Sequence, residues 1–217
     1  VLLKGGKGGR GNATFKSSVN QTPRQTTEGK AGSEGNFVFT LKTIADVGLV
    51  GFPNAGKSTL LNVLSNATPK IASYPFTTLV PTVGVIDFPD EFASITMADV
   101  PGLIEGAAEN RGLGHRFLRH VERCRLLVFL IDLSSADGRE PWNDFIHLRK
   151  ELEDYDPRVA DKPFVLVGNK IDEQNAPENL ALCKKKFPDT EVLSISAILE
   201  EGLSELRHKL FEKLKKK

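Results

Sequence analysis

The chain has 217 residues, of which 40% are hydrophobic and 26% charged, values typical of a soluble globular protein with one or two domains. Its apolar runs fall well short of the roughly 20 residues that a membrane-spanning helix needs, and no signal peptide is visible. Its two cysteines, Cys124 and Cys183, are too few for a disulfide framework and stand in no metal-ligand spacing. We therefore predict a cytoplasmic protein.

The composition of the chain changes near residue 43. Residues 1–43 hold seven Lys or Arg residues against two Glu residues, a net charge of +5, so the remaining residues carry −4. The same segment holds eight of the 19 glycines, which raise the entropic cost of ordering the backbone. We expect an irregular or flexible glycine-rich region over 1–43, with one strand-like piece at Asn36–Leu41, and a folded domain over 44–217.

The folded domain alternates short apolar runs with helical patterns. The predicted strands are Ala45–Val50, Val83–Phe88, Ser94–Asp99, Leu126–Asp132, Phe164–Asn169 and Val192–Ser196. The predicted helices are Lys57–Leu64, Gly114–Arg123, Trp142–Tyr155, Pro177–Phe187 and Glu201–Lys215. This alternation predicts an α/β fold with a mostly parallel six-stranded sheet and helices on both faces.

The turn between the first predicted strand and helix matches the phosphate-binding pattern G-x-x-x-x-G-K-[ST]. Its residues are Gly51, Phe52, Pro53, Asn54, Ala55, Gly56, Lys57 and Ser58, followed by Thr59. The glycines let backbone N–H groups converge on phosphate oxygens, and the helix start adds positive potential. In this pattern Lys57 neutralises the β- and γ-phosphates and the Ser58 hydroxyl binds magnesium. The domain is therefore predicted to be a P-loop NTPase.

Two further segments predict a magnesium site and a γ-phosphate sensor. The run Asp99, Val100, Pro101 and Gly102 begins where a predicted strand ends. That end of a parallel strand faces the ligand in open α/β sheets, so we expect Asp99 to support the metal and the Gly102 N–H to contact the γ-phosphate. A threonine between the first helix and the next strand is expected to be the second hydroxyl ligand, and spacing alone leaves Thr77 and Thr78 open.

The segment after the strand Phe164–Asn169 predicts recognition of guanine. It reads Asn169, Lys170, Ile171 and Asp172. The Asp172 carboxylate can accept two hydrogen bonds from the guanine edge, which adenine cannot supply, and such a site rejects the wrong base by roughly 10⁴-fold. We expect Lys170 to pack its stem over the base and Asn169 to tie this loop to the phosphate loop. Backbone groups of Ser196, Ala197 and Ile198 are expected to contact the base.

One position departs from the common GTPase pattern. A glutamine that orients the attacking water often follows D-x-x-G, but here the residue is Leu103, which cannot hydrogen-bond to water. Intrinsic hydrolysis should therefore be slow. We hypothesise that Asn54 helps to hold a potassium ion beside the phosphates, where its charge would act as an arginine finger does in other enzymes.

These segments together resemble the Obg family of GTPases, within the translation-factor-related class, over nearly the whole chain. The resemblance rests on Gly51–Ser58, on Tyr74, Pro75, Phe76, Thr77, Thr78, Leu79, Val80 and Pro81, on Asp99–Ala107, and on Gly112, Leu113, Gly114, Phe117, Leu118 and His120. It favours Thr78 as the hydroxyl ligand and places 76–80 in the nucleotide site. Together with the phosphate-loop motif and the potassium hypothesis, this gives Lys57, Thr78 and Asn54 as the residues expected to act in catalysis.

The resemblance also implies a biological setting. It implies slow, magnesium-dependent GTP hydrolysis, association with the large ribosomal subunit and its rRNA during assembly, and binding of guanosine tetraphosphate in the stress response. The segments Asn12–Phe15 and Thr22–Gln25 resemble the end of the family's glycine-rich N-terminal domain. We therefore expect the chain to be a monomeric fragment that holds the end of this domain and the GTPase domain. For the basic segment 1–43, we favour a domain remnant over an RNA contact.

Two alternative functions stay open on the sequence. Leu103 favours a guanine-nucleotide sensor that scaffolds a partner with negligible turnover. A P-loop kinase that uses ATP is the second alternative, and Asp172 argues against it.

Overall fold

The computed structural model describes residues 2–37, 45–71, 81–99 and 121–215. The chain divides into two compact units, Val1–Leu41 and Lys42–Lys217. Each unit is considered by itself below. Within the described ranges, no helix is both long and apolar enough to cross a membrane.

The N-terminal unit is built from extended chain with a single turn of 3₁₀ helix, η1 (Asn12–Phe15), among its described residues. Two extended segments pair through every third residue. The backbone bonds run from Thr27 N to Arg10 O (3.0 Å), from Lys30 N to Lys7 O (2.8 Å) and from Ser33 N to Lys4 O (2.9 Å). This period is that of a polyproline-type helix, which has three residues per turn. Glycine is required at Gly6 and Gly9 because a Cβ atom there would collide with a carbonyl oxygen of the facing segment.

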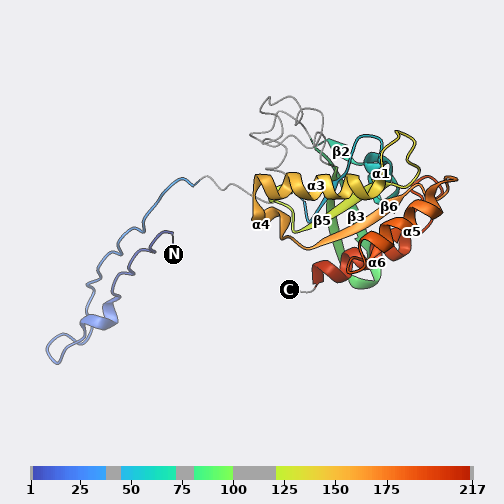
Figure 1. Cartoon of the computed structure of the whole chain (residues 1–217). Coiled ribbons are helices and arrows are strands. Elements are labelled where there is room, and N and C mark those ends of the chain that lie inside the picture. Colours follow the sequence, from blue (N-terminus) through green and yellow to red (C-terminus); the bar gives the residue numbers. More distant parts are fainter. Residues whose placement is uncertain (1, 38–44, 72–80, 100–120, 216–217) are drawn as a thin grey trace. The chain divides into compact units, whose positions relative to one another are not determined.

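The second unit contains a seven-stranded sheet in the order β2-β3-β4-β1-β5-β6-β7 (Figure 1). Its strands are β1 (Val47–Val50), β2 (Lys70–Ile71), β3 (Thr82–Phe88), β4 (Ala93–Asp99), β5 (Leu126–Asp132), β6 (Phe164–Asn169) and β7 (Val192–Ser194). The pairs β4–β1, β1–β5, β5–β6 and β6–β7 are parallel, and β3 is antiparallel to both of its neighbours. The carboxyl ends of β1, β4, β5, β6 and β7 therefore lie at one edge of the sheet.

Helices pack on both faces of this sheet. They are α1 (Lys57–Leu64), α3 (Pro141–Tyr155), α4 (Pro157–Ala160), α5 (Ala176–Lys186) and α6 (Leu203–Lys215), and a 3₁₀ turn, η2 (Pro89–Glu91), joins β3 to β4. The apolar side chains of α1 and α6 share one core cluster, and those of α3 and α5 share the other. Figure 1 shows α3 and α6 on opposite sides of the sheet.

Strand β5 shows why its sequence is apolar throughout. Leu126, Val128 and Leu130 point into the α1/α6 core, whereas Leu127 and Phe129 point into the α3/α5 core. Every residue of β5 is buried. A central strand of a parallel sheet has no solvent face, so it needs apolar side chains on both sides.

The α/β fold with a mostly parallel sheet is confirmed, and all six predicted strands are present. The additional strand, β2, lies at the edge of the sheet and has only two residues. A strand this short shows no hydrophobic period in the sequence. The helix α4 spans four residues and was not predicted for the same reason. The predicted helix Gly114–Arg123 and the strand-like piece Asn36–Leu41 lie largely outside the described residues.

Both cysteines belong to the α3/α5 core, and neither forms a disulfide. Burial raises the pKa of the Cys124 thiol to about 12 and that of Cys183 to about 11. Because the thiolate is the reactive form, we expect no reaction of the native protein with a thiol reagent such as DTNB at pH 8, and reaction of both thiols after denaturation. Rapid modification of one thiol in the native state would contradict this packing.

Candidate functional site

The phosphate loop is shaped by its neighbours as well as by its own glycines. Gly51 follows the buried strand β1, and a Cβ atom at this position would lie 2.6 Å from Leu130 O. Gly56, the residue just before helix α1, has φ 94°, a left-handed conformation that a side chain would strain. Asn54 also has a positive φ, 63°, which asparagine tolerates better than most residues. The loop therefore curls back over the start of α1.

The ammonium group of Lys57 folds back onto this loop. Its Nζ atom donates to Gly51 O at 3.0 Å and to Phe52 O at 2.8 Å. The positive charge thus lies within the curve of the loop, in front of the N-terminus of α1. A helix N-terminus and a lysine at one place favour the binding of an anionic group.

Ser58 and Asp99 meet beside the phosphate loop. Ser58 lies in the first turn of α1, Asp99 ends β4, and the register of the sheet pairs Asp99 with Leu49 of β1. The Ser58 hydroxyl donates to Asp99 Oδ2 at 2.5 Å. The other carboxylate oxygen, Asp99 Oδ1, is buried and has no hydrogen-bond partner among the described residues, and a bound water or ion can satisfy a buried oxygen of this kind.

These two side chains fit a magnesium ion. Magnesium prefers one or two carboxylates together with substrate phosphates over a cage made only by the protein. Within the described part of the chain, no group of three or more His, Cys, Asp or Glu residues is arranged to bind a metal. Ser58 and Asp99 are the residues here that could hold the ion.

The loop after β6 forms the other side of the site. Lys170 has φ 66°, so the chain turns sharply after the strand. Its ammonium group pairs with Asp132 Oδ2 at 2.5 Å, and Asp132 Oδ1 in turn accepts from Ser134 N and Ser134 Oγ. Asp172, two residues further along, is exposed and lines the pocket.

Asn169 joins the two halves of the site. Its side chain is 2% exposed, and its Nδ2 atom donates to Ala55 O in the phosphate loop at 2.8 Å. Its Oδ1 atom accepts from Ala197 N at 3.0 Å, in the turn that follows β7. A Cβ atom on Gly56 would collide with Nδ2, so the glycine also makes room for this amide. One buried amide therefore links three loops.

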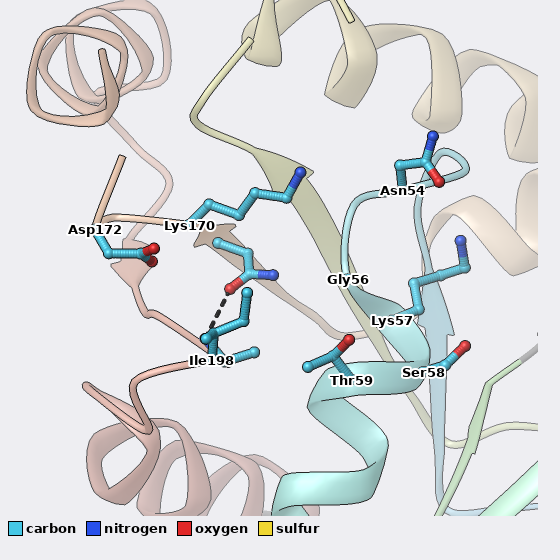
Figure 2. Close-up of a pocket in the computed structure, with 10 residues that line it drawn as sticks. Asn54, Gly56, Lys57, Ser58, Thr59, Lys170, Asp172 and Ile198 are labelled. Carbon is cyan, nitrogen blue, oxygen red and sulfur yellow. Dashed lines mark hydrogen bonds between the residues drawn. The ribbon is translucent and has the colours of Figure 1, made fainter. Parts of the chain in front are cut away.

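These residues surround a pocket of about 370 Å³ at the carboxyl edge of the sheet. Its lining consists of Asn54, Gly56, Lys57, Ser58, Thr59, Asn169, Lys170, Asp172, Ala197 and Ile198. Figure 2 shows Asp172 on one side of this pocket and Asn54, Lys57 and Ser58 on the other. The residues predicted to bind phosphate and those predicted to read the base thus share one concave surface, with Lys57 and Asp172 in the same pocket.

Not every predicted site residue lies on that surface. Seven predicted site residues lie outside the pocket lining, namely Gly51, Phe52, Pro53, Ala55, Asp99, Ile171 and Ser196. One of them, Ile171, donates its N–H to Ile195 O and so joins the loop after β6 to the end of β7. A further set of predicted residues lies outside the described ranges: Phe76, Thr77, Thr78, Leu79, Val80, Val100, Pro101, Gly102 and Leu103.

Sequence reasoning overlooked Asp132, Ser134 and Arg139. The sequence did hold a signal for Asp132, because this residue ends an otherwise apolar strand at the same edge as Asp99 and Asn169. Arg139 carries no such signal, because it lies in the connection between β5 and α3 and reaches the phosphate loop only in three dimensions, where its Nη2 donates to Pro53 O.

The fold and the pocket define a P-loop nucleotide-binding protein. The family of 50S ribosome-binding GTPases matches residues 46–170, and the family described as GTP1/OBG matches residues 1–43. The chain belongs to the Obg family of GTPases.

Similar proteins agree with this assignment. A protein named GTPase Obg from Akkermansia muciniphila is 50% identical over 212 residues, which cover 98% of this chain and 60% of that protein. The matches to Obg proteins from Opitutus terrae and Bacillus pumilus cover 63% and 49% of their lengths, so the chain spans about half to two thirds of such relatives.

Solved structures of Era share the fold. A crystal structure of Aquifex aeolicus Era bound to GDP.AlF4- has a TM-score of 0.59 at 29% identity, and the match covers 82% of this chain and 58% of that one. A structure of Era in complex with MgGDPNP and part of 16S ribosomal RNA has a TM-score of 0.59 at 31% identity, with 77% and 55% covered.

Replacing Asn169 tests the link between the loops. Asn169→Ala leaves the Ala55 carbonyl and the Ala197 N–H buried without partners, at about 1–3 kcal/mol each. We expect a lower melting temperature in calorimetry, even without nucleotide. Asn143→Ala is the control, because Asn143 is exposed and its side chain donates to Glu140, at the start of its own helix. Equal stability of the two variants would show that the amide link is dispensable.

Proposed function

We propose that this chain is the GTP-binding and GTP-hydrolysing part of an Obg-type switch that acts in assembly of the large ribosomal subunit and in the stress response. The observation that carries the proposal is the pocket in which Lys57 and Asp172 face one ligand space, joined by the buried amide of Asn169. The relatives named GTPase Obg and the family of 50S ribosome-binding GTPases support the ribosomal setting.

On the phosphate side, Lys57 and the first N–H groups of α1 are proposed to bind the β- and γ-phosphates. Ser58 and Asp99 would hold magnesium, with Thr78 as the further hydroxyl ligand. The ion supplies charge that stabilises the phosphates during transfer. The Era structure that contains MgGDPNP supports magnesium as the metal. Gly102 is proposed to sense the γ-phosphate through its N–H group.

On the base side, Asp172 is proposed to accept hydrogen bonds from guanine. Lys170 would lie along the base, held in place by its ion pair with Asp132. The exposed side chain of Ile198 and the backbone of Ala197 line the same part of the pocket. Asp172, the carboxylate in the pocket lining, is assigned to the base, so catalysis is proposed to rest on positioning and charge.

Changing Asp172 tests the specificity for guanine. A site built around this carboxylate prefers GTP over xanthosine triphosphate by roughly 10⁴-fold. We expect Asp172→Asn to reverse that preference in competition binding assays, because the amide can donate to the xanthine oxygen. Glu173→Gln removes the same charge one residue away and should leave the preference unchanged. A wild-type protein that prefers ATP would favour the kinase alternative.

A potassium ion beside Asn54 is proposed to accelerate hydrolysis. We expect single-turnover phosphate release to be faster in potassium than in sodium at equal ionic strength, by up to about 10³-fold, the lower end of what an arginine finger supplies. Asn54→Ala should abolish the difference. Equal rates of wild type in the two salts would rule out the ion.

The same assay separates the switch from the sensor alternative. Leu103 in place of a water-orienting glutamine favours a protein that binds nucleotide and turns it over negligibly. Nucleotide binding without phosphate release, both alone and with large ribosomal subunits, would support that alternative. Release that rises when the subunits are added would support the proposed switch.

A further inference from the structure

The connection between β5 and α3, residues 133–140, contacts both halves of the nucleotide site. Just before it, Asp132 at the end of β5 forms an ion pair with Lys170, and Ser134 within the connection donates to Asp132. Near its end, the Arg139 side chain lies against the phosphate loop. A connection outside the sequence motifs therefore lies between the base-reading and phosphate-binding sides.

Arg139 makes two contacts with the outer side of the phosphate loop. Its guanidinium carbon lies 4.5 Å from the centre of the Phe52 ring, and its Nη2 atom is 3.4 Å from Pro53 O. The next residue is Asn54, which has a positive φ and lines the pocket. A cation over an aromatic face and a bond to the adjacent carbonyl fix both the ring and the peptide.

Two acidic side chains fix Arg139 in turn. Asp137 Oδ2 accepts from Nη2 at 3.2 Å, and Asp144 Oδ2 lies 3.6 Å from Nε. Asp144 is 5% exposed in the first turn of α3. Burial raises the pKa of this carboxyl, and the charge of Arg139 opposes that rise. The guanidinium is therefore held between a buried carboxylate on α3 and the phosphate loop.

We propose that Arg139 is a positioning residue of the nucleotide site, which holds Phe52 and Pro53 so that the phosphate loop is already curved before nucleotide binds. This inference rests on the proposed function of the pocket. Preorganisation lowers the cost of ordering a loop on binding. Loss of Arg139 should therefore weaken the binding of phosphates without changing the reading of the base, since Asp172 lies on the far side of the pocket (Figure 2).

The test compares Arg139→Gln with Arg149→Gln. Arg149 has the same kinds of contact, a bond to Ala160 O at 3.1 Å and a place 4.9 Å from the Phe164 ring, but these two partners lie outside the phosphate loop. We expect Arg139→Gln to weaken GDP binding about tenfold in calorimetric titration with magnesium. The ratio of GDP to IDP affinity should stay unchanged, and Arg149→Gln should bind GDP as wild type does. Equal GDP affinity for Arg139→Gln and wild type would overturn the proposal.

Hydrogen exchange of the nucleotide-free protein gives a second readout that does not depend on ligand. Arg139→Gln should speed amide exchange in the phosphate loop, residues 52–57, whereas Arg149→Gln should not. If wild type fails to bind guanine nucleotides, the proposed function fails, and the exchange rates still decide whether Arg139 orders the loop. Unchanged exchange there would reject the positioning role.

A milder substitution covers the case in which Arg139→Gln does not fold. Arg139→Lys keeps the charge but loses the planar fork that serves the ring, the carbonyl and two carboxylates together. In the double variant with Phe52→Leu, the loss of GDP affinity should be smaller than the sum of the two single losses, since the contact between Arg139 and Phe52 is lost in both. Fully additive losses would contradict a shared contact.

Discussion

The two hydrogen bonds of the Asn169 side chain hold the candidate site together. The amide is almost fully buried and bonds to Ala55 on one side and to Ala197 on the other. Losing hydrogen bonds in a buried setting lowers stability, because the backbone groups left without a partner are not solvated by water. The phosphate loop, the loop after β6 and the turn after β7 therefore have one relative arrangement, and the pocket between them has one shape.

The sheet makes this arrangement possible. Parallel strands β1, β4, β5, β6 and β7 all end at one edge, and each carries a polar residue or loop there. Asp99, Asp132 and Asn169 are the last residues of three strands, β4, β5 and β6. Their side chains bond to different partners, namely Ser58, Lys170 and the phosphate loop, so the proposed metal site and the proposed base site lie at this edge with a link between them.

The sequence anticipated much of this site because its motifs are local. The run Gly51–Ser58 fixes a loop between strand and helix, and the link from Asn169 to the phosphate loop followed from the motif in which it stands. Residues whose role depends on distant neighbours were harder to find. Arg139 contacts Pro53, which lies 86 positions away in the chain. The residues around Arg139 form no pattern that predicts this contact.

The sequence by itself determined the class of fold, the order of strands and helices, and the residue types that can bind phosphate, magnesium and guanine, because periodicity and short motifs depend on neighbouring residues. Only the tertiary structure decided which side chains hold those residues in place. Asp132 on Lys170 and Arg139 on Phe52 are contacts between segments 38 and 87 positions apart. Such contacts exist only after the sheet has brought the strand ends to one edge, since chain distance alone does not constrain them.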